Sequence, residues 1–145
     1  MSANDAQLTR IVTTSTGTTT EDSEPNTPAP GAAPGTDFEL LVEAVAGNVI
    51  GSTLAPYTLT LTCIDEVLAA PNPAMSVGPL NQKFGDSGDG WTGPVGAVGN
   101  LTLTKKLRIK VPNGVRGHAF HYIGTLVDQP GNVVSFLHSN AFILV

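Results

Sequence analysis

The chain has 145 residues, 41% hydrophobic and 13% charged, which suits one domain with a packed core. Seventeen threonines, 16 glycines and 11 prolines favour strands and tight turns over helices. The formal net charge of −5 argues against nucleic acid as a partner, because a phosphate-binding surface needs an excess of basic residues.

The N-terminal part differs in composition from the rest. Residues 8–20 form a Thr-rich, β-branched run that includes Ile11 and Val12, and residues 21–35 are rich in proline. We therefore expect residues 1–36 to form an extended arm and linker, and residues 37–145 to form the folded domain. The strand-forming residues of the arm predict that it adds a strand to a sheet edge, and we favour the sheet of a neighbouring subunit.

Two segments of the domain alternate between apolar and polar residues, which is typical of half-buried strands. Residues 38–44 place apolar side chains opposite Glu39 and Glu43, and residues 57–63 place them opposite threonines. Residues 78–99 are glycine-rich and read as a loop around Trp91. We expect Trp91 to cover one end of the core, whereas an exposed Trp91 would mark a binding anchor.

Residues 101–111 predict a strand with a basic outer ladder made of Lys106, Arg108 and Lys110. Lys105 falls on the inward side of this pattern, which indicates a bulge or a position near the rim of the sheet. The ladder discourages edge-to-edge aggregation, or it binds an acidic partner. The arm carries such a partner in Glu21, Asp22 and Glu24, so we hypothesise that these acids meet the ladder of an adjacent subunit.

The C-terminal part contributes two more strands. Residues 118–127 are apolar on both sides of the alternation and predict a central strand covered on both faces. Residues 133–145 predict a last strand interrupted at Ser139 and Asn140, with an apolar end that must be buried in its own sheet or in a neighbour.

These elements predict an all-β protein, namely a single immunoglobulin-like or fibronectin-like β-sandwich of six or seven antiparallel strands with an N-terminal arm. A jelly roll is the main rival architecture. The likeness is one of architecture alone, since the paired cysteines and the central-strand tryptophan of antibody domains are missing.

No residue pattern points to catalysis. His118 and His121 are three residues apart on an expected strand, where their side chains point to opposite faces. A lone Cys63 and three histidines match no zinc-binding spacing, and the acids of the loop at residues 86–90 lack the further ligands of a calcium site. We expect no catalytic residue, no cofactor and no bound metal.

The sequence therefore predicts a non-enzymatic structural subunit of a larger particle or filament, such as a phage or virus decoration or tail protein or a surface-fibre subunit. Its partner would be protein, either further copies of itself or another structural subunit. The alternatives are a monomeric carbohydrate- or protein-binding module that uses the Trp91 loop, and a small metal enzyme that uses His118, His121 and His138. The chain shows no signal peptide and no apolar run of membrane-spanning length, so we expect synthesis in the cytoplasm and incorporation into a virion or an extracellular assembly.

Overall fold

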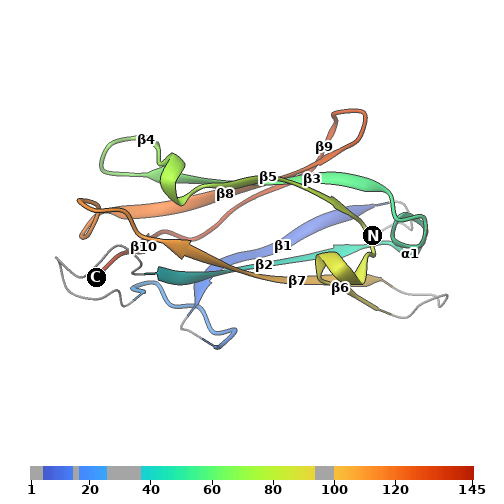
Figure 1. The fold of residues 1–145 in the computed structure, drawn as a ribbon, viewed down its shortest axis with the longest axis horizontal. Helices are drawn as coiled ribbons and strands as arrows, with labels where there is room; N and C mark the ends of the chain where they lie inside the picture. Colours follow the sequence, from blue (N-terminus) through green and yellow to red (C-terminus); the bar gives the residue numbers. More distant parts are fainter. Residues whose placement is uncertain (1–4, 15–16, 26–36, 94–99) are drawn as a thin grey trace.

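The computed structural model describes residues 5–14, 17–25, 37–93 and 100–145, which form two antiparallel β-sheets packed face to face (Figure 1). The first sheet is the lower layer in Figure 1, and its strands follow the order β1-β2-β7-β6. These strands are β1 (Ala6–Thr14), β2 (Asp37–Ala46), β7 (Leu101–Lys110) and β6 (Trp91–Thr92).

The second sheet is the upper layer in Figure 1 and is centred on β3 (Pro56–Asp65) and β8 (Ala119–Asp128). Two strands flank β3, namely β5 (Val77–Lys83) and β4 (Ala70–Pro71). Two others flank β8, namely β9 (Val133–His138) and β10 (Phe142–Ile143). The helical elements are short: α1 (Asn48–Ser52), η1 (Pro73–Met75) and η2 (Ser87–Asp89). None of the helices in the described ranges has the length and apolarity needed to cross a membrane.

The core lies between the two sheets and follows the alternation that the sequence predicts. In β3, every second residue from Tyr57 to Cys63 is buried, and the threonines between them face outward. In β7, Leu101, Leu103 and Ile109 are buried while the basic ladder is exposed. Both predictions are confirmed, and each large apolar side chain buried in this way contributes about 1.5–3 kcal/mol relative to exposure.

The N-terminal segment belongs to this core, which corrects the expectation that it pairs with a neighbouring subunit. Strand β1 pairs antiparallel with β2 of the same chain from Ala6 to Thr14, with a bulge between Leu8 and Arg10. Ile11 packs in the core between the sheets, and Val12 is buried on the other side of β1, opposite Leu41. The pairing and the core contacts of β1 are therefore made inside one chain. The rest of the expected linker, residues 26–36, lies outside the described residues.

The space for β1 depends on a glycine in the facing sheet. A Cβ atom added to Gly124 in β8 would lie 2.5 Å from Cδ1 of Ile11, 3.2 Å from Leu61 and 3.3 Å from Leu8. Real Cβ atoms do not approach other atoms to 2.5 Å, so the close packing of Ile11 requires glycine at this position.

Of the two positions expected for Lys105, the one near the rim is confirmed: Lys105 lies in a regular ladder opposite Val42, without a bulge, where the short β6 leaves this edge of β7 unpaired.

Two further expectations about strands need correction. Strand β8 is central within its sheet, but its outward residues are only partly buried, because the second sheet has a covering layer on one side alone. Residues 77–83, read from the sequence as loop, form the edge strand β5.

The C-terminal segment follows the prediction more closely. The last strand is interrupted between β9 and β10, which confirms the expected break at Ser139 and Asn140. Phe142 and Leu144 are buried within the chain's own sandwich. The N–H of Ile143 donates to the carbonyl of Ser23 at 2.9 Å, so the segment after β1 lies beside β10 at this end of the molecule.

We expect Gly124→Ala to lower the free energy of unfolding by about 1–3 kcal/mol, because the new methyl group overlaps Ile11. Ile11→Val removes the overlapped Cδ1 atom and costs about 0.5–1.5 kcal/mol by itself. The double variant should therefore lose less than the sum of the two single variants, by about 1 kcal/mol, in urea unfolding monitored by circular dichroism. Additive losses would contradict the contact between β1 and β8.

Candidate docking surface

The outer face of the first sheet is charged, and its charges are paired across neighbouring strands. The acids of β2 lie between Arg10 of β1 and the basic ladder of β7. Arg10 contacts Glu43 at 3.1 Å and Arg108 contacts Asp37 at 3.2 Å. The basic ladder therefore has acidic neighbours within its own chain, and exposed pairs of this kind contribute about 0–1 kcal/mol each.

The acids of the N-terminal arm lie elsewhere, so the expected contact between them and the basic ladder does not form within the chain. The carboxylate of Glu21 accepts a hydrogen bond from the Asn140 side chain at 3.2 Å. The N–H of Asp22 donates to the carbonyl of Thr13 at 2.7 Å, and the N–H of Glu24 donates to the Asp22 carboxylate at 3.0 Å. These contacts hold the acids beside β1 and near the break between β9 and β10.

The outer face of the second sheet has a different composition. On β3 and β8, the residues that alternate with the buried ones point outward. The residues of β9 that pair with the outward residues of β8 point the same way. We call this surface the neutral face: it comprises Thr58, Thr60, Thr62, Ile64, His121, Ile123, Thr125, Val127, Val133, Phe136 and His138. These outward positions of β3, β8 and β9 hold no Asp, Glu, Lys or Arg, whereas Lys83 of β5 and Glu66 lie at the margins of the face.

Apolar exposure on the neutral face is greatest along β9. Phe136 is 65% exposed and Val133 is 61% exposed, whereas the neighbouring threonines of β3 are partly buried. An exposed sheet face normally carries polar and charged residues, and this combination of aromatic, β-branched and threonine side chains departs from that composition.

Two of the three histidines stack on the neutral face. The rings of His121 and His138 lie 5.7 Å apart at an interplanar angle of 14°, and Phe136 contacts His138 edge-on at 6.2 Å. Nδ1 of His121 lies 2.9 Å from the carboxylate of Glu66. His118 lies apart from this pair, with its Nδ1 2.8 Å from the carboxylate of Asp65. The described residues include no group of three or more metal-ligating side chains that could hold an ion.

The carboxyl group of Asp65 is 1% exposed and holds the turn between β3 and β4. Its Oδ1 accepts hydrogen bonds from the N–H groups of Val67 and Leu68 at 3.0 and 3.2 Å. Burial of the carboxyl raises its pKa, but the hydrogen bonds with His118, Leu68 and Val67 outweigh this and keep the pKa of Asp65 below its ordinary value of 3.8. The turn therefore presents the exposed Val67 and Leu68 side chains in one fixed arrangement beside the neutral face.

Trp91 covers one end of the core, as the sequence predicts, and is only 2% exposed. Its indole N–H donates to the Tyr57 hydroxyl at 3.1 Å, and this hydroxyl donates to Gln82 at 2.7 Å. Phe84 packs against both aromatic rings. The buried indole offers no stacking platform to a sugar or a peptide. Residues 94–99 of the expected Trp91 loop lie outside the described residues.

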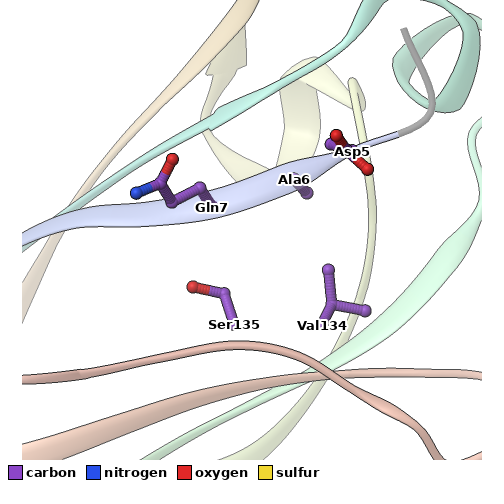
Figure 2. Close-up of a pocket in the computed structure, with 5 residues that line it drawn as sticks. All are labelled: Asp5, Ala6, Gln7, Val134 and Ser135. Carbon is purple, nitrogen blue, oxygen red and sulfur yellow. The ribbon is translucent and has the colours of Figure 1, made fainter. Parts of the chain in front are cut away.

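The buried titratable groups are poorly suited to nucleophilic chemistry. Burial raises the pKa of the Cys63 thiol to about 12 and that of the Tyr57 hydroxyl to about 12, so both stay protonated at neutral pH. A cleft of about 280 Å³ opens between β1 and β9, lined by Asp5, Ala6, Gln7, Val134 and Ser135 (Figure 2). It lies beside the hydrogen bond from the Leu8 N–H to the Ser135 hydroxyl, where the edges of the two sheets meet. Its volume is near the lower limit of about 300 Å³ for small-molecule sites, and its lining holds no aromatic side chain.

The sequence analysis missed the neutral face. It assigned partner binding to Ile11 and Val12, which are buried, and to Trp91, which is also buried. The available signal was the absence of charged residues at the outward positions of residues 57–64, 121–127 and 133–138. This signal became visible only when the structure placed the three segments side by side.

No protein-family model matches the chain, and a search of curated proteins found none that is similar to it in sequence.

We expect Asp65→Asn to destabilise the protein in a pH-dependent way. Because the folded pKa of Asp65 is lowered, its carboxylate stabilises the fold at pH values above 3.8, and this contribution is lost as the pH falls below that value. The difference in unfolding free energy between wild type and variant should therefore be largest at pH 6 and decrease below pH 4. Urea titrations at each pH measure it. A difference that stays constant from pH 6 to pH 3 would contradict this role.

Proposed function

We propose that the chain is a non-enzymatic structural subunit of a larger assembly and that it docks through its neutral face. The observation that carries the proposal is the lack of charged residues on this face combined with the exposure of Phe136 and Val133. The centres of protein interfaces are depleted of charged residues and enriched in aromatic ones, which matches this surface. A particle or filament, such as a phage or virus particle or a surface fibre, is the kind of assembly we have in mind.

The free-energy cost of desolvation makes the neutral face a better docking surface than the outer face of the first sheet. A partner that covered the first sheet would have to desolvate Arg10, Glu43 and the basic ladder, and the cost of burying charges often exceeds the attraction gained. A threonine hydroxyl buried without a hydrogen bond costs about 1–3 kcal/mol, which is far less than an unpaired charge costs, and apolar side chains have no such cost.

The arm supports this choice of surface. Because β1 is joined to β2 through residues 15–36, its effective concentration at the sheet edge is on the order of millimolar. Pairing within the chain therefore prevails over exchange with another subunit at ordinary protein concentrations. We accordingly propose docking through the neutral face in place of docking through the arm.

We also propose that the sandwich is immunoglobulin-like. The order β1-β2-β7-β6 in one sheet, facing β9-β8-β3-β5 in the other, supports this proposal, since it corresponds to the strand order of immunoglobulin domains. Cys63 has no cysteine partner and Trp91 lies in β6, so the chain departs from the disulfide and tryptophan of antibody domains.

We expect the variant Thr62→Lys with Thr125→Lys to stay out of the native assembly, because a partner would have to bury two unpaired charges. Produced in the cells that naturally make the chain, the wild type should sediment with a complex larger than a monomer, and the variant should sediment alone. The matched control is Thr102→Lys with Thr104→Lys, which places the same charges on the exposed side of β7. Incorporation of both variants at the wild-type level would refute docking through the neutral face.

A further inference from the structure

We infer that the partner of the neutral face is a second copy of this chain, packed face to face about a twofold axis. This inference rests on the proposed function, because it names the occupant of the same surface. It follows from the placement of charge, from the area of the face and from its shape.

The placement of charge allows two copies with a net charge of −5 each to approach. Packed sheets lie about 10 Å apart, so face-to-face contact through the neutral faces leaves the charged outer faces of the two copies about 30 Å apart. The Debye length at physiological salt is about 8 Å, so the charged faces of the two copies are screened from each other. Contact through the first sheets would instead desolvate the paired charges of both copies.

The area of the face is in the range of a weak, reversible dimer. Three strands, β3, β8 and β9, at a spacing of about 4.8 Å and a length of about 30 Å give roughly 430 Å² per copy. Two copies would bury roughly 860 Å², which is within the range below about 1,200 Å² of weak, transient interfaces. In Figure 1, β4 and η1 are drawn above one end of this sheet and the turn between β8 and β9 above the other.

The shape of the face is self-complementary. Its bulky side chains, Val133, Phe136 and His138, lie on β9, while the third strand, β3, presents the short side chains Thr58, Thr60 and Thr62. A twofold axis that runs along β8 places β9 of each copy over β3 of the other. Phe136 then packs on threonines, and Thr125 of one copy lies opposite Thr125 of its partner.

The test uses opposite charges on the same surface. Purified wild type should be a dimer in sedimentation equilibrium, while Thr62→Lys/Thr125→Lys and Thr62→Glu/Thr125→Glu should each associate at least about 100-fold more weakly, since like charges meet across the axis. An equimolar mixture of the two variants should regain the dimer, because lysines then face glutamates. Only contact between two neutral faces restores association in this way. A mixture that stays monomeric while the wild type dimerises would overturn the inference.

Phe136→Ser provides a second readout that does not depend on added charge. Because Phe136 is 65% exposed in the single chain, the variant should unfold at the same urea concentration as wild type when both are measured as dilute monomers. Its self-association should nevertheless weaken at least about tenfold. The pair Thr102→Lys/Thr104→Lys serves as the control and should dimerise like wild type.

The outcomes separate this inference from the proposed function. The purified wild type could be a monomer both at about millimolar concentration and after 100-fold dilution, while the neutral-face lysine variant is still lost from the native assembly. With these two results, the face binds a different protein. In that case the second-copy inference fails and the docking function stands. If the lysine variant both dimerises and enters the assembly, both proposals fail.

Discussion

The pairing of β3 with β8 is the constraint on which the rest of the structure depends. These strands pair over nine residues, from Tyr57 with Asp128 to Asp65 with Phe120, without a break in register. Because side chains alternate strictly along a strand, this register decides at once which residues enter the core and which form the neutral face. A slip of one residue would exchange Leu59 and Leu61 for threonines in the core.

The outer faces of the two sheets differ in composition. The first sheet carries acids on β2 and bases on β1 and β7 around the buried Val12 and Leu41 of its outer side, and its unpaired edge at β7 carries lysines that oppose edge-to-edge pairing. On the second sheet the outward positions of β3, β8 and β9 are uncharged, with Phe136 exposed at the edge, and charged residues flank them: Lys83 at the end of β5 and Glu66 beyond β3. This asymmetry gives the sandwich two outer faces of different composition, and the proposed docking uses the less charged one.

Local patterns were sufficient to predict the strands that alternate clearly. The expected strands around residues 57–63 and 101–111 and the break at Ser139 agree with the structure, since alternation and turn residues are local properties. Strand β5 was missed because Gly78 and Pro79 read as loop, whereas they form an irregularity within the edge strand, between Val77 and Leu80, which both pair with β3. The fate of the arm was misjudged for a related reason. Its polar, Thr-rich sequence resembles a free tail, and only the fit of Ile11 against Gly124 shows that the arm belongs to the core.

The sequence by itself determined the class of the protein: an all-β chain whose apolar residues, spaced two apart, require two packed sheets. It also predicted that His118 and His121 face opposite ways, because side chains alternate along a strand, and the structure places them beside different acids, Asp65 and Glu66. Only the tertiary structure decided where β1 pairs, which acids neutralise the basic ladder, and that three uncharged segments lie side by side. These three outcomes depend on contacts between residues far apart in the chain, such as Thr62 beside Ile123 and Thr125 beside Phe136. Local pattern carries no information about such contacts, because the register between distant strands is set by how well their side chains pack together in the folded state.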